Sequence, residues 1–92
     1  NMQDDAMVEV VCELGANGPR PMSVGNIPQF NLGLLVNQVS CEKLIVDAYF
    51  ENSYQKALEA FTLNRLINDA KKARKVLDAL IEANRGMWPE LR

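Results

Sequence analysis

Apolar and polar residues alternate along the first part of the chain. From Met7 onward, apolar side chains occupy every second position, namely Val8, Val10, Cys12 and Leu14. This period of two is typical of a β-strand with one buried face. The Gly-Ala-Asn-Gly stretch that follows predicts a turn, and Pro19 and Pro21 restrict the return segment to an edge or irregular strand. The pattern predicts a half-buried β-hairpin over about residues 6–24.

A helical period replaces the alternation after the next glycine. Asn26 is an N-cap candidate and Pro28 fits a first helical turn, so a long helix is predicted over about residues 28–50. Gly33 lies inside this helix at a cost of about 1 kcal/mol relative to Ala, which predicts close packing of another element there. The apolar residues form two stripes, so the helix should have neighbours on more than one side. One stripe holds Leu32, Leu35, Val36 and Val39, and the other holds Leu34, Cys41, Ile45, Ala48 and Tyr49.

Two shorter helices are predicted in the second half of the chain. Ser53 is a suitable cap for a helix over about residues 53–63, and Asp69 for another over about residues 69–84. Trp88, beyond the last helix, is expected to pack against a helix end. The predicted fold class is α+β and mostly helical, with an N-terminal β-hairpin followed by three helices.

Composition and charge exclude several classes of function. The chain of 92 residues carries a net charge of −2, and its basic residues at positions 71–75 are followed by Asp78 and Glu82, so this cluster is expected to be a solvated helix face. A nucleic-acid partner is therefore not predicted. No apolar run reaches the roughly 20 residues that span a bilayer, so we expect a cytoplasmic protein without membrane contact.

Candidate catalytic chemistry is sparse. The chain has no histidine, no G-x-G-x-x-G loop and no cluster of metal ligands, so no catalytic, cofactor-binding or metal-binding residue is predicted. Cys12 and Cys41 are expected to be buried free thiols. Glu9 and Glu13 share the outer face of the first strand, where solvated surface is a better interpretation than a catalytic pair.

One polar pair in the long helix leaves two interpretations open. Asn37 and Gln38 either satisfy neighbouring backbone groups or face water, or they border a polar pocket that other parts of a larger protein complete. The sequence does not decide between these alternatives, and both residues are kept as candidates for the edge of a pocket.

Several segments together resemble the C-terminal end of family 4 glycoside hydrolases. They are "DDAMVEVV", "GPRPMSVGNIPQFNLGLLVNQVSCEKLIVDAYFENSYQKALEAFTLNRL" and "VLDALIEANRGMWPELR", and they cover essentially the whole chain. The resemblance is strongest to the phospho-α-glucosidase branch, the maltose-6-phosphate glucosidases. One departure occurs at Val11, where family members usually have proline.

The resemblance implies a function for a larger parent protein. Such enzymes cleave 6-phosphorylated disaccharides with NAD and a divalent metal such as Mn²⁺, through hydride abstraction at C3 of the sugar, proton removal at C2 and elimination. Their NAD loop, metal ligands and catalytic base precede the matched segment, so the chain is expected to be an inactive C-terminal fragment of the substrate and oligomerisation domain of a homo-oligomeric enzyme. The alternative is a small helical protein–protein interaction module without catalysis.

Overall fold

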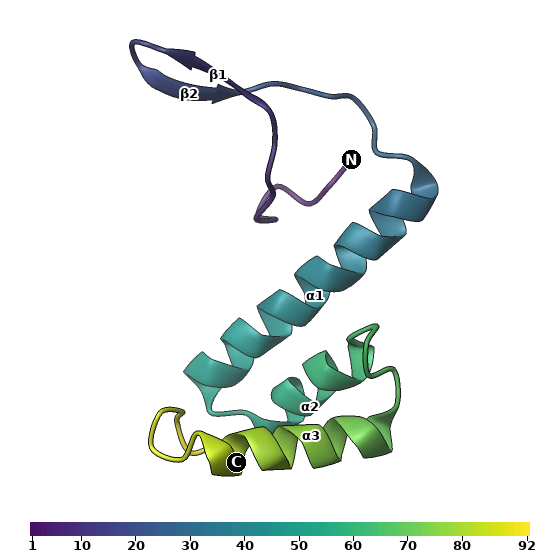
Figure 1. The fold of residues 1–92 in the computed structure, drawn as a ribbon, viewed down its shortest axis with the longest axis vertical. Coiled ribbons are helices and arrows are strands. Elements are labelled where there is room, and N and C mark those ends of the chain that lie inside the picture. Colours follow the sequence, from purple (N-terminus) through teal and green to yellow (C-terminus); the bar gives the residue numbers. More distant parts are fainter. The chain divides into compact units, whose positions relative to one another are not determined.

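The structure is a computed structural model that describes all residues of the chain, Asn1–Arg92. It contains two compact units, Asn1–Val36 and Asn37–Arg92. A two-stranded hairpin precedes three helices along the chain (Figure 1), which confirms the predicted α+β fold class. The elements are β1 (Cys12–Gly15), β2 (Gly18–Pro21), α1 (Gln29–Glu51), α2 (Tyr54–Leu63) and α3 (Ala70–Ala83).

The hairpin is shorter and more exposed than its sequence pattern predicts. β1 and β2 are antiparallel, with Cys12 opposite Pro21 and Gly15 opposite Gly18. Gly18 has a φ of 93°, which a residue without Cβ adopts at little cost. Every residue of both strands is exposed, so the prediction of a half-buried strand is wrong for this chain. The alternating apolar residues are present, but no second layer in this unit covers them.

The start of α1 differs from the expectation at its cap. The Leu32 N–H donates to the Pro28 carbonyl at 2.9 Å, so Asn26 lies outside the helix and the predicted cap is wrong. Backbone N–H groups at a helix start have no partner within the helix. Proline, which has no N–H, therefore loses no hydrogen bond at this position. Around Gly33, no atom other than those of the adjoining residues and of the helix's own backbone lies within 4 Å of the place a Cβ would occupy, so the predicted close packing is also not found in this chain.

Side-chain caps define the starts of the two shorter helices. The Ser53 hydroxyl accepts from the Lys56 N–H at 3.2 Å, and the Asp69 carboxylate accepts from the Lys72 N–H at 2.8 Å. The hydrogen bond to the Lys72 N–H lowers the pKa of Asp69, because it stabilises the carboxylate. Both residues act as the predicted N-caps.

The core of the helical unit is small and rich in alanine. Its centre joins Ala48 of α1, Ala57 of α2 and Leu77 of α3, all of them buried. Alanine lets the helix backbones approach closely, and bulkier side chains complete the cluster at its margin: Tyr54, Leu58, Phe61, Ile81 and Leu91. Three helices therefore share one hydrophobic cluster in this unit.

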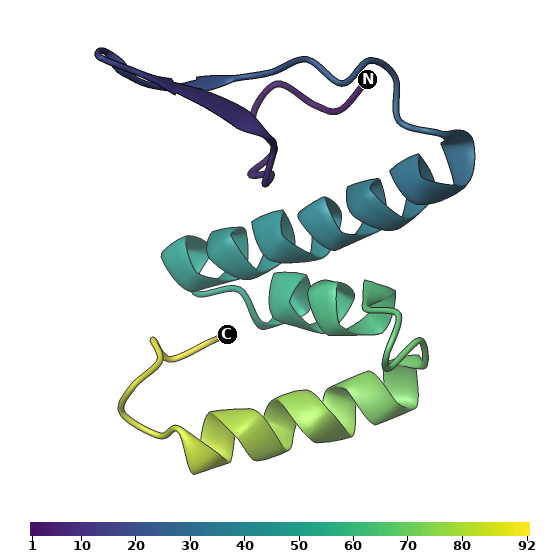
Figure 2. The ribbon, with the colours of Figure 1, turned by 45° about the horizontal axis from the view of Figure 1, so that its top comes forward.

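The C-terminal residues turn back onto the connection between α1 and α2 (Figure 2). The Arg92 N–H donates to the Asn52 carbonyl at 2.8 Å, and the Tyr54 N–H donates to the Arg92 carbonyl at 3.0 Å. Trp88 makes an edge contact with Tyr49 at 6.3 Å between ring centroids, as expected of a tryptophan that packs at a helix end. The C-terminal tail therefore contacts the end of α1 and the connection between α1 and α2.

Much apolar surface remains exposed on α1. Of its residues only Val39, Cys41 and Ala48 are buried, although apolar side chains occur on two sides of the helix. Phe30 and Phe50 are 75% and 77% exposed, respectively. The long helix therefore has fewer neighbours in this chain than its two stripes predict.

Candidate functional site

A polar depression of about 820 Å³ lies where α1, α2 and the start of α3 meet. Asn37 borders it, and its side-chain amide donates to the Leu63 carbonyl at 3.3 Å. The other polar residues of its wall are Gln55, Glu59, Thr62, Arg65 and Asn68. The amide side chains both donate and accept hydrogen bonds, so this surface can bind a polar group. Glu59 and Arg65 carry opposite charges, so the surface does not favour a ligand of either charge.

An apolar groove of about 490 Å³ lies against the middle of α1 and the end of α2. Gln38 borders this groove, and its side-chain nitrogen donates to the Glu42 carboxylate one helical turn later at 2.9 Å. The two predicted pocket-edge residues therefore line different depressions. Asn37 satisfies a neighbouring backbone carbonyl, as the first interpretation proposed, whereas the role of either residue at the edge of a binding pocket stays a prediction.

The two cysteines occupy different environments. Cys41 is buried in the wall of the apolar groove, as predicted, and burial raises the pKa of its thiol. Cys12 is exposed on the hairpin, so its predicted burial is wrong, because its strand has no covering layer. Both thiols are free.

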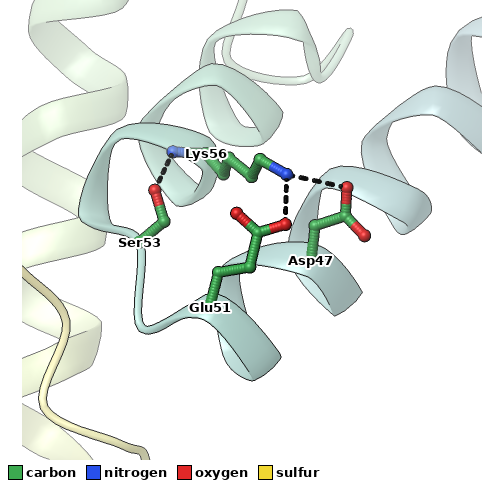
Figure 3. A network of polar contacts seen from close by, with 4 residues as sticks. All are labelled: Asp47, Glu51, Ser53 and Lys56. Atoms are coloured by element: carbon green, nitrogen blue, oxygen red, sulfur yellow. Dashed lines mark hydrogen bonds and ion pairs between the residues drawn. The ribbon is translucent and has the colours of Figure 1, made fainter.

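A polar cluster that the sequence analysis missed joins the end of α1 to the start of α2 (Figure 3). The Lys56 Nζ lies 3.1 Å from the Asp47 carboxylate and 2.6 Å from the Glu51 carboxylate, while its backbone N–H donates to Ser53. These ion pairs raise the pKa of Lys56, with Glu51 the larger cause. The signal in the sequence was a pair of carboxylates one helical turn apart, followed by a lysine after the cap. Because the single ammonium of Lys56 contacts both carboxylates, the cluster is suited to stabilising the connection between α1 and α2.

A second polar contact links α2 to α3. The Tyr54 hydroxyl donates to the Asp78 carboxylate at 2.7 Å, and the Arg74 guanidinium lies over the tyrosine ring at 6.0 Å from its centroid. The hydrogen bond to Asp78 raises the pKa of Tyr54, and partial burial adds to the shift. The hydrogen bond between the Tyr54 hydroxyl and Asp78 therefore joins the start of α2 to α3.

No three His, Cys, Asp or Glu side chains are placed to hold a metal ion. Glu13 forms an ion pair with Arg20 across the hairpin. No helix is long and apolar enough to cross a membrane.

The chain belongs to the family 4 glycosyl hydrolases. The model of the family 4 glycosyl hydrolase C-terminal domain matches residues 1–67, which include the hairpin, α1 and α2. This confirms the resemblance drawn from the sequence.

Known members of the family match the chain along its whole length. It is 52% identical over 91 residues to maltose-6′-phosphate glucosidase MalH of Clostridium acetobutylicum, a match that covers 99% of this chain and 21% of that protein. The chain thus spans about a fifth of the length of the curated relatives it matches.

Two crystal structures share the fold of the entire chain. A 6-phospho-α-glucosidase from gut microorganisms in complex with NAD and Mn²⁺ is 83% identical, with a TM-score of 0.94. A second 6-phospho-α-glucosidase from gut microorganisms, in complex with NAD and glucose-6-phosphate, is 50% identical, with a TM-score of 0.93. Each comparison covers 100% of this chain and 21% of the other.

Proposed function

We propose that the chain is the C-terminal structural part of a 6-phospho-α-glucosidase that uses NAD and Mn²⁺. The observation that carries the proposal is the match to the NAD- and Mn²⁺-bound enzyme, at 83% identity over the whole chain. At this identity, the fold and the specificity of the larger protein are expected to be shared. The substrate class is a 6-phosphorylated disaccharide, in agreement with the glucose-6-phosphate bound to the second structure.

The chain's own residues do not fit the two cofactors. No group of side chains is suited to Mn²⁺, and the sequence has no glycine-rich dinucleotide loop. The residues that bind the cofactors and cleave the bond, by the oxidation and elimination route that the family resemblance implies, are proposed to lie in the other four fifths of the polypeptide. The chain alone should then be inactive.

The contribution of the chain itself is proposed to be a scaffold. Two features that join the helices support this role, namely the alanine-rich helical core and the Lys56 cluster that links α1 to α2. The exposed apolar surface of α1 and the apolar groove beside it are suited to contacts with the rest of the enzyme and with further subunits of a cytoplasmic homo-oligomer. Asn37 remains our candidate for the edge of a polar pocket, and Gln38 for the neighbouring groove.

An assay of the complete encoded polypeptide tests the proposal. Intact mass gives its length, and hydrolysis of a chromogenic 6-phospho-α-glucoside is measured with NAD and Mn²⁺, with either one omitted, and with the 92-residue chain alone. We expect activity only in the complete protein with both cofactors. Hydrolysis without either cofactor would contradict the cofactor dependence. A natural polypeptide of about the length of this chain would favour the alternative, a helical interaction module.

A further inference from the structure

The hydrogen-bond register of the hairpin determines which backbone groups of β1 point outward. The Met22 N–H donates to the Val11 carbonyl at 2.9 Å, and these residues continue the register of the two strands. In an antiparallel ladder, pairs of residues that hydrogen-bond to each other alternate with pairs that do not. The backbone N–H and C=O groups of the second kind of pair point away from the partner strand. Cys12 and Leu14 are the next residues of the second kind, so their N–H and C=O groups point away from β2.

The opposite edge of the hairpin cannot pair in the same way. The residues opposite Cys12 and Leu14 are Pro21 and Pro19, and they occupy the outward positions of β2. Proline has no N–H to donate, so a strand added there would leave its own carbonyls unpaired. The two edges are therefore unequal, and only β1 presents alternating donors and acceptors.

The side chains of the hairpin also favour a covering strand. Cys12, Leu14, Pro19 and Pro21 share one face because cross-strand neighbours lie on the same side of a sheet. Leu14 is 82% exposed. An isolated hairpin is at best marginally stable in water, whereas a third strand adds both hydrogen bonds and apolar contact.

We propose that β1 pairs along its outer edge with a third strand of the same polypeptide, from the part that precedes Asn1 in the complete enzyme. This inference rests on the proposed function, since it requires the longer chain. The relatives extend over about five times this length and the matched domain is the C-terminal one, so most of their polypeptide precedes it. A second copy of the chain would offer the same outward edge, and the dilution experiment below distinguishes it from a preceding strand.

Amide hydrogen exchange in the complete protein tests the inference at single residues. Glu13 serves as an internal standard for a paired amide and Asn17, in the turn, for an unpaired one. We expect exchange at Cys12 and Leu14 to be at least about a hundredfold slower than at Asn17 and close to that of Glu13. Exchange within about tenfold of Asn17 would overturn the proposal. Protection that disappears on dilution to monomer would also overturn it, and would assign the edge to a second copy.

A matched pair of variants checks the role of the outward N–H. Leu14→Pro removes this donor without removing a hydrogen bond inside the hairpin, and should reduce the protection of Cys12 at least about tenfold. Leu14→Val keeps the donor and should retain the protection. Equal protection in both variants would contradict the proposal. If Leu14→Pro prevents folding, exchange in the unmodified protein still decides.

The two proposals fail in different ways. Hydrolysis with NAD and Mn²⁺ but unprotected Cys12 and Leu14 amides would leave the proposed function standing and remove the third strand. Protected amides in a complete protein without this activity would remove the proposed function and leave the strand pairing in place.

Discussion

Leu77 is the largest buried side chain at the centre of the helical core, and its replacement by Ala tests how that core is built. The side chain is 4% exposed, and the fully buried residues beside it, Ala48 and Ala57, contribute a single methyl group each. Leu77 is therefore the one large side chain among the buried residues at this centre. We expect the substitution Leu77→Ala to destabilise the unit Asn37–Arg92 severely.

The expected magnitude follows from the removed volume and the stiffness of the site. Three carbon atoms leave the core, and at about 0.8 kcal/mol per methylene their transfer accounts for about 2.4 kcal/mol. Ala48 and Ala57 have no side-chain freedom to fill the space, so a cavity adds to this cost. We expect a loss of about 3 kcal/mol in the free energy of unfolding, within the range of about 2 to 5 kcal/mol for such changes.

Urea unfolding followed by far-ultraviolet circular dichroism measures the change. Leu80→Ala is the matched control, because it removes the same atoms from a side chain that is 44% exposed on the same helix. Its cost should be about half, near 1 to 1.5 kcal/mol, since less apolar area returns to water. The slope against urea should stay unchanged in both variants.

Two results would contradict a core centred on Leu77. One is a loss below about 1 kcal/mol for Leu77→Ala, the size typical of an average substitution. The other is an equal loss for the two variants. Either would mean that the three helices do not pack around Leu77.

Two further predictions concern the helix caps. Ser53→Ala should lower the free energy of unfolding by about 1 kcal/mol by leaving the Lys56 N–H unpaired; Ser53→Asp, which keeps an acceptor, should restore it in the same urea titration. The lowered pKa of Asp69 means that its stabilising effect is fully present above its unfolded pKa of 3.8 and is lost as pH falls through the lower folded value. Asp69→Asn should therefore weaken the loss of stability between about pH 5 and pH 2, and an unchanged pH profile would contradict this role.

Local sequence signals predicted the helices well because their starts depend on short-range chemistry. Ser53 and Asp69 are caps whose oxygen atoms meet an N–H three residues later, a contact that needs no tertiary structure. The cap expected at Asn26 failed because Pro28 supplies the first acceptor carbonyl, and the helix begins at the next residue, Gln29. At this helix start, Pro28 therefore outweighed the capping preference of Asn26.

Burial was predicted less well because it depends on segments distant in the sequence. The alternation around Cys12 and Leu14 indicates a face suited to burial, but whether a layer covers it is not encoded in the strand. Gly33 likewise indicates room for a close neighbour, and in this chain that room is open. The separation of Asn37 and Gln38 into two depressions also arises from packing, since adjacent residues on a helix point in different directions.

The sequence by itself determined the element order, the caps of α2 and α3, the proline-blocked edge of β2 and the family. These follow from local preferences or from the identity of residues in a fixed order. Only the tertiary structure decided that Ala48, Ala57 and Leu77 meet at one centre and that Lys56 joins two carboxylates of α1. Such contacts depend on the angle at which helices cross and on how closely their backbones approach, and no short window of sequence contains that information.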